Sequence, residues 1–187
     1  MTNQSPRGGT ELQFEYLKKH VDPKLLDQFE ICTSVPEKIP LSLNKINILW
    51  QKNSWDQGNL INWFQDKSNH DKYDWYVFNS NWNFEQFTKK FELPTEKCLV
   101  IKNGIENIEP VPTIYKKGEP VKIIHHCTPW RGLSVLLGAM QLVKNPLISL
   151  DVYSSTEVYG KAFHDHNDHH YHDLYNQAKK LPNVNYI

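Results

Sequence analysis

The sequence predicts an α/β protein built on parallel sheets, for three reasons. Short apolar runs typical of buried strands alternate with segments in which apolar residues recur at helical spacing. Strands and helices in alternation are typical of parallel sheets joined by crossover helices. The 187 residues, 39% hydrophobic and 22% charged, suffice for a packed core and do not have the composition of a disordered chain.

Strands and helices are expected to alternate from the start of the chain to residue 101. Thr10 with Gln13 and Ser54 with Gln57 match the capping-box pattern with which a helix begins. Apolar runs such as INILW and KCLVI are typical of strands, and 81–91 places three phenylalanines on one helical face. We expect helices at 9–21, 54–66 and 81–91, and strands at 29–34, 46–50, 74–79 and 97–101.

A segment without periodicity separates this part from the rest. Residues 102–120 hold three prolines and two glycines, which favours a loop or an interdomain linker. The alternation resumes after it, so we predict two lobes, 1–106 and 121–187, joined by a linker at 107–120. In the second lobe we expect strands at 121–127, 147–153 and 184–187, and helices at 131–144 and 169–181.

Charge and apolar content exclude several classes of protein. Lysine plus arginine equals aspartate plus glutamate, 21 against 21, so there is no basic excess for general binding to nucleic acid or to an anionic membrane surface. No apolar run approaches the ~18 residues of a spanning helix, and the start MTNQSPRGGTE lacks the apolar core of a signal peptide. Cys32, Cys98 and Cys127 are interpreted as reduced core thiols, so we expect a cytoplasmic protein.

Two glycine-containing loops at helix starts are candidates for phosphate binding. Gly8 and Gly9 let the backbone approach a phosphate at a helix N terminus; the alternative is a flexible lead into the helix. Thr128 and Arg131 lie in the run TPWRG after strand 121–127, at the carboxyl end where ligands bind in open α/β sheets. A guanidinium there suits a phosphate, and the alternative is an ordinary surface arginine.

Further polar side chains follow predicted strands. Ser154 and Ser155 come directly after strand 147–153, where their hydroxyls either bind a ligand or cap the next turn, which is the commoner role. The run WQKN at 50–53 would face the cleft if its strand is parallel to its neighbours. One histidine of the pair at 125–126 must point into the sheet and is better explained as a satisfied core residue.

Residues 164–173 (HDHNDHHYHD) hold five of the nine histidines. His166 and His170 are four residues apart, as are Asp168 and His172, so a helix here would present a pair of metal ligands. The H-E-x-x-H pattern is missing, and no distant acidic or cysteine ligand is evident. We therefore expect an exposed, mobile insertion without a physiological metal, with adventitious zinc or nickel binding as the alternative.

Several segments resemble the retaining "group 1" (family 4-like) glycosyltransferases of the GT-B class. IKNGIE at 101–106 is similar to the family's junction segment I-P-N-G-I-D. IIHHCTPWRGLSVLLGAMQLVKNPLISLDVYSS at 123–155 resembles its strand, phosphate turn, long helix and next strand. FNSNWNFEQFTKKFELPTEKCLV at 78–100 and the glycines at 8–9 resemble parts of its first lobe. The resemblance covers nearly the whole chain and is most specific from the junction to Ser155.

The resemblance implies two Rossmann-like lobes, with the acceptor on the N-terminal side and the nucleotide-sugar donor on the C-terminal side. The donor would be a UDP- or GDP-sugar, with no further cofactor and no metal required. Arg131 would contact its diphosphate with Thr128 beside it, Gly8 and Gly9 would approach the same diphosphate, and Ser154 and Ser155 would line the nucleoside pocket.

The sequence also departs from the family's pattern. Lys102 replaces the usual junction proline, and Gln51, Lys52 and Asn53 stand where a histidine near the sugar is common. The family's acidic element would lie beyond residue 187 and its opening strand before residue 1, so the chain is expected to be truncated at both ends, with both lobes incomplete.

Two functions remain open from the sequence. The first is glycosyl transfer from a nucleotide sugar to an unknown acceptor, which would be a glycan, a lipid or a protein; no catalytic residue is identified. The alternative is a catalytically inactive remnant that acts as a nucleotide-binding or assembly module. Neither involves nucleic acid or a transmembrane segment.

Overall fold

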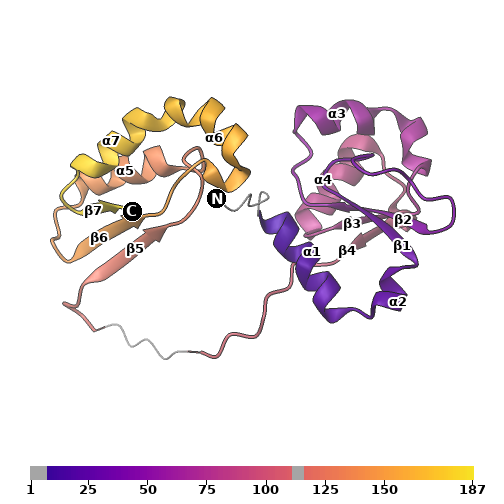
Figure 1. Cartoon of the computed structure of the whole chain (residues 1–187), viewed down its shortest axis with the longest axis horizontal. Coiled ribbons are helices and arrows are strands. Elements are labelled where there is room, and N and C mark those ends of the chain that lie inside the picture. Colours follow the sequence, from indigo (N-terminus) through magenta and orange to yellow (C-terminus); the bar gives the residue numbers. More distant parts are fainter. Residues whose placement is uncertain (1–7, 111–115) are drawn as a thin grey trace. The chain divides into compact units, whose positions relative to one another are not determined.

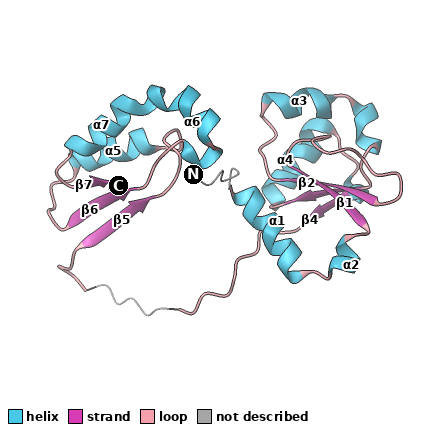
Figure 2. Ribbon diagram, viewed as in Figure 1, coloured by secondary structure: helices cyan, strands magenta, loops and turns pink. Residues whose placement is uncertain are grey.

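The computed structural model describes residues 8–110 and 116–187, and these contain two separate parallel β-sheets (Figure 1). The chain divides into two compact units, one formed by Gly9–Asn107 and the other containing Ile108–Ile187. We call them the N-terminal unit and the C-terminal unit and describe each by itself. Figure 2 shows that each combines a sheet with several helices, so the protein is α/β with parallel sheets.

The N-terminal unit contains a four-stranded parallel sheet whose strand order follows the sequence. The strands are β1 (Phe29–Thr33), β2 (Ile46–Gln51), β3 (Trp75–Phe78) and β4 (Cys98–Val100), in the order β1-β2-β3-β4. Because each strand pairs with the preceding one, all connections run in one direction along the sheet. Right-handed crossovers then place the connecting helices on one face.

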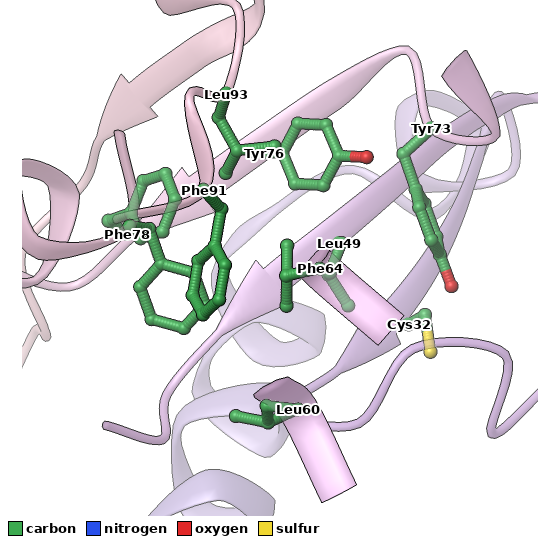
Figure 3. Packing of buried hydrophobic residues seen from close by; sticks show 10 residues of the cluster. Cys32, Leu49, Leu60, Phe64, Tyr73, Tyr76, Phe78, Phe91 and Leu93 are labelled. Carbon is green, nitrogen blue, oxygen red and sulfur yellow. The ribbon is translucent and has the colours of Figure 1, made fainter. Parts of the chain in front are cut away.

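That face carries an aromatic core (Figure 3). It is covered by α3 (Gly58–Gln65) and α4 (Asn81–Phe91), with the short 3₁₀ helices η1 (Lys67–Asp71) and η2 (Thr95–Lys97) completing the connections. The fully buried Phe64 ring of α3 lies 4.8 Å from that of Phe87 and 5.3 Å from that of Phe91, both on α4. Contacts of this kind join the two helices into one layer over the strands.

The opposite face of this sheet is less completely covered. Here α1 (Gly9–His20) and α2 (Pro23–Leu26) leave a cavity of about 200 Å³, and α1 has no fully buried residue. The cavity is lined only by apolar side chains from these helices, from the strands and from the segment after β4. They are Leu17, Val21, Leu25, Leu26, Phe29, Ile31, Ile48, Trp50, Val77 and Ile101.

Long-range polar contacts fix α1 to the segment that follows β4. The Gln13 side-chain amide donates to the Gly104 carbonyl (2.8 Å) and accepts from the Gly104 N–H (3.1 Å). Lys19 forms an ion pair with Glu106. The expected capping box of Thr10 and Gln13 is therefore wrong, because α1 already begins at Gly9 and Gln13 binds the backbone elsewhere in the chain.

The C-terminal unit has the same design with three strands. These are β5 (Val121–His125), β6 (Ile148–Val152) and β7 (Val184–Tyr186), parallel and in the order β5-β6-β7. The core lies between the sheet and the helices α5 (Leu133–Leu142) and α7 (His172–Lys180), and includes Leu137, Leu150 and Ala178. The segment between β6 and α7 forms η3 (Glu157–Tyr159), α6 (Lys161–Asn167) and η4 (Asp168–Tyr171).

Three detailed expectations differ from the structure. Helix α3 begins at Gly58 after Gln57, not at Ser54. The histidine-rich segment is helical in α6 and η4, with His164 and Asp168 half-buried, so it is not an exposed insertion throughout. Cys127 is exposed and is not a core thiol, although all three cysteines are free. Among the described residues, no helix is long and apolar enough to cross a membrane.

Candidate functional site

Buried polar atoms without a partner gather at one edge of each sheet. In the described residues six buried side-chain nitrogen or oxygen atoms have no hydrogen-bond partner; five belong to the end of a strand or to the segment after it, and the sixth, of Asn83, lies in the first turn of α4. Leaving such an atom unpaired costs about 1–3 kcal/mol, and ligands bind at the carboxyl ends of parallel strands. These atoms therefore mark candidate sites. They are Ser34 Oγ, Trp50 Nε1, Gln51 Nε2, Asn83 Oδ1, His125 Nε2 and Thr128 Oγ1.

Thr128 and Arg131 form the turn between β5 and α5. The Arg131 N–H donates to the Thr128 carbonyl (2.9 Å), and Gly132, the N-cap residue before α5, has a φ of +81°. The Thr128 side chain is only 7% exposed, whereas that of Arg131 is exposed. Within residues 8–110 and 116–187 the Arg131 guanidinium has no hydrogen bond or ion pair, so its charge is available to a ligand at the N terminus of α5.

Ser154 and Ser155 follow β6 and lie beside this turn. The buried Ser154 hydroxyl donates to the Cys127 carbonyl (2.7 Å), and its own carbonyl accepts from the Tyr186 hydroxyl (2.7 Å). Ser155 Oγ accepts from the Glu157 N–H (3.0 Å). The structure thus brings Thr128, Arg131, Ser154 and Ser155 to one edge, where both serine hydroxyls also have structural partners.

His125 ends β5 at the same edge. Its Nε2 atom is buried and has no partner among the described residues. Burial lowers the pKa of His125, and the neighbouring His126 lowers it further. The imidazole is therefore held in its neutral form more readily than an exposed histidine. The expectation that this residue is a satisfied core histidine is wrong, because one ring nitrogen lacks a partner.

A group of aromatic rings borders this edge. Trp130, which precedes Arg131, lies 5.7 Å from Tyr159, 6.0 Å from Phe163 and 5.7 Å from Tyr171, measured between ring centroids. The Trp130 and Tyr159 rings are stacked at 26°. Trp130 is 41% and Tyr159 40% exposed, so the group offers π faces to a planar ligand.

The histidine-rich segment is organised around Asp168. Asp168 Oδ1 accepts from the hydroxyls of Thr156 (2.7 Å) and Tyr175 (3.0 Å). Burial raises the pKa of Asp168, but these hydrogen bonds and the nearby His164 and His172 outweigh it and hold the pKa below its usual value. Nowhere in the described part of the chain do three or more His, Cys, Asp or Glu side chains form a group that could hold a metal ion.

The edge of the N-terminal unit has a polar cluster around Asn53. Gln51 Oε1 accepts from the Asn53 N–H (2.8 Å), and Asn83 Nδ2 donates to the Asn53 carbonyl (3.3 Å). This leaves Gln51 Nε2 as a buried donor and Asn83 Oδ1 as a buried acceptor. Because a hydroxyl group both donates and accepts, it has the chemistry to satisfy the two atoms.

The remaining predicted site residues are Gly8 and Gly9. Gly9 is the first residue of α1 and Gly8 precedes it; their contact with a phosphate stays a prediction. Sequence analysis missed Ser34, Asn83 and Tyr159. Ser34 follows a strand, which is the same signal that singled out Ser154, whereas Asn83 and Tyr159 depend on how distant segments pack.

The chain resembles several solved structures, among them that of TarM. The chain aligns with the crystal structure of TarM, a glycosyltransferase, with a TM-score of 0.52 and 15% sequence identity, over 97% of this chain and 36% of the TarM chain. It therefore spans about a third of the length of that protein. The similarity is one of fold. No protein-family model and no curated protein sequence matches the chain.

Proposed function

We propose that the chain takes part in glycosyl transfer, with the edge around Arg131 binding the diphosphate of a nucleotide-sugar donor. The observation that carries this proposal is the pairing of an unpartnered guanidinium with two buried, unpaired polar atoms, Thr128 Oγ1 and His125 Nε2, at the carboxyl end of β5. The glycosyltransferase fold supports it. The two-lobe GT-B arrangement is part of the proposal.

The chemistry of this edge suits a leaving diphosphate. Arg131 supplies a cation beside the N terminus of α5, and α5 supplies free N–H groups and the positive end of its dipole, next to the turn where Thr128 lies. Positive groups placed in advance stabilise negative charge as it develops. The Trp130 and Tyr159 rings would stack on the UDP or GDP base, and Gly8 and Gly9 would approach the diphosphate.

Replacing Arg131 tests the donor site. In Arg131→Ala we expect binding of UDP or GDP to weaken by about 1.5–3 kcal/mol, which is about 10–150-fold, because a charged hydrogen bond is lost. Uridine or guanosine should lose less, since only the diphosphate carries the charge. Isothermal titration of the chain with each ligand gives both numbers. Lys180→Ala, which removes an exposed cation from α7 of the same unit, is the matched control.

The outcomes separate the candidate functions. Equal losses for the diphosphate and the nucleoside would mean that Arg131 is structural and the site is misplaced. Binding that depends on Arg131, combined with no donor hydrolysis or transfer to glycan, lipid or protein acceptors, would favour the inactive nucleotide-binding module. Transfer that disappears in Arg131→Ala would support the enzyme.

A further inference from the structure

Lys52 lies directly after β2 at the carboxyl edge of the N-terminal unit, and its ammonium is unusually placed. Its Nζ atom donates to Asn103 Oδ1 (2.8 Å) and lies 3.4 Å from the centroid of the Trp50 ring. The side chain is half-buried, yet it pairs with no carboxylate within residues 8–110 and 116–187. A partly desolvated cation without an acid is costly unless a ligand supplies the negative charge.

The carboxyl ends of β1 and β2, which Lys52 follows, hold buried donors that lack acceptors. The Trp50 indole N–H, the Gln51 amide and the Ser34 hydroxyl are all buried and unpartnered. Ser34 is adjacent to Trp50, since its N–H donates to the Trp50 carbonyl (3.0 Å), and it has a φ of +66°. A non-glycine residue in this conformation is strained, and such strain is concentrated at functional sites.

Side chains alternate along a strand, so Trp50 and Lys52 share one face of the sheet and Gln51 points to the other. The indole N–H therefore lies on the same side as the ammonium, whereas the Gln51 amide belongs to the cluster around Asn53. The Asn103 side chain, which follows β4, already binds Lys52 through its oxygen. The ammonium keeps two further N–H donors after this bond.

We propose that Lys52, with Trp50 and Asn103 beside it, is a binding site for an oxyanion such as a phosphate, sulfate or carboxylate group. If the proposed function holds, the anion is a group of the acceptor. Only this identification of the acceptor rests on the proposed function; the anion site itself does not. Oxygen atoms of an oxyanion accept from the ammonium and the indole N–H together, which pairs the indole N–H and balances the charge of the ammonium.

The proposal has a definite pH dependence. Burial lowers the pKa of Lys52 to about 8, and an anion binds the protonated amine. Binding is therefore strongest below that pKa and is lost as the pH rises through it, while a bound anion raises the pKa. The protonated fraction of an amine with this pKa falls by about 30-fold between pH 6.5 and pH 9.5.

Sulfate is the suitable probe, because its charge is constant over this pH range. We expect sulfate to shift the Trp50 indole N–H and Lys52 side-chain NMR signals in a saturable way, with the affinity falling at least tenfold between pH 6.5 and pH 9.5. Lys52→Gln should abolish the response and Lys52→Arg should keep it. Lys90→Gln is the matched control, since Lys90 also lies over a tryptophan, Trp55, at 4.7 Å but is exposed.

Parallel titrations with phosphate, acetate and glucose identify the ligand chemistry. Phosphate or acetate should compete with sulfate, and the stronger competitor shows whether a tetrahedral or a planar oxyanion fits. Unchanged sulfate affinity in folded Lys52→Gln, or a response to neutral glucose equal to that for sulfate, would overturn the proposal. The test of the anion site is independent of donor binding. If sulfate binds at Lys52 but the chain shows no glycosyl transfer, only the proposed function is refuted.

Discussion

The three cysteine thiols have different surroundings, and their reactivity depends on these surroundings. Cys127 is exposed, whereas Cys32 is 2% exposed and donates its S–H to the Val35 carbonyl (3.0 Å). Cys98 is half-buried, donates to the Pro94 carbonyl (3.3 Å), and has its pKa raised to about 12 by burial. Their reactivities must differ accordingly, since the thiolate is the reactive form.

We expect only one of the three thiols, that of Cys127, to react rapidly with a chromogenic disulfide. At pH 8 a thiol of pKa about 12 is thiolate in only about one molecule in 10⁴, and Cys32 is shielded, so Cys127 should react with a chromogenic disulfide at least about 100-fold faster than either. Cys127→Ser should remove the fast phase, and Cys98→Ser should leave it intact. A fast phase that disappears in Cys98→Ser would contradict the burial assigned to this residue.

Residues of the candidate site differ in how far sequence could predict them. Thr128 and Arg131 were predictable because an apolar strand followed by a helical stripe fixes the turn between them. Asn83 was not, since its position beside Gln51 depends on α4 packing next to the end of β2. The sequence could not predict the unpaired nitrogen of His125 either, because a pattern of apolar residues does not reveal which polar atoms lack partners.

Among the elements, α5 offers a pair of glycines in contrasting conformations. Gly132 is the N-cap residue before the helix, at φ +81°, and Gly138 lies within the helix; an added Cβ would meet no atom within 4 Å at either position. Steric contact therefore plays no part, and only the backbone decides the effect of a substitution. A left-handed φ costs an L-residue about 1–2 kcal/mol, whereas alanine is favoured over glycine inside a helix.

Gly132→Ala should consequently destabilise the C-terminal unit by about 1–2 kcal/mol, and Gly138→Ala should stabilise it by about 0.5–1 kcal/mol. Hydrogen exchange of α5 and β6 at increasing urea concentrations measures both, because it reports on the C-terminal unit alone. Shifts of the same sign in the two variants would show that the φ of Gly132 does not determine the outcome.

At this scale the sequence predicted the seven strands of the described residues and the helices α1, α3, α4, α5 and α7, but it missed α2 and α6 and some of the boundaries. Ser54 and Gln57 match a capping box, yet α3 begins only at Gly58. The backbone of Asn53 is held by Gln51 and Asn83, and Trp55 packs against the core, so tertiary contacts keep this segment out of the helix. Local patterns cannot anticipate such contacts.

On the scale of the whole molecule, the two units have separate cores. Phe64 belongs to the core of the N-terminal unit and Leu137 to that of the C-terminal unit, and both are fully buried. No residue is shared between the two clusters. A cavity made in one core should therefore destabilise that unit first.

We expect Phe64→Ala to cost about 3–5 kcal/mol and Leu137→Ala about 2–5 kcal/mol, each within its own unit. Hydrogen exchange followed by mass spectrometry should show lost protection in β2 and β3 for the first and in β6 and α5 for the second. Trp82→Ala and Val135→Ala, at side chains 57% and 76% exposed, are the matched controls and should change little. Loss of protection in both units from one core variant would contradict this independence.

The strand orders β1-β2-β3-β4 and β5-β6-β7 also bear on how the protein is made. In each sheet every strand after the first pairs with the strand that left the ribosome just before it. Paired residues are 17 to 34 positions apart in the sequence, so no strand of the described residues has to wait for a partner synthesised much later. Each sheet can grow one strand at a time during translation, and its first strand and its newest strand are the edges open to pairing with other chains.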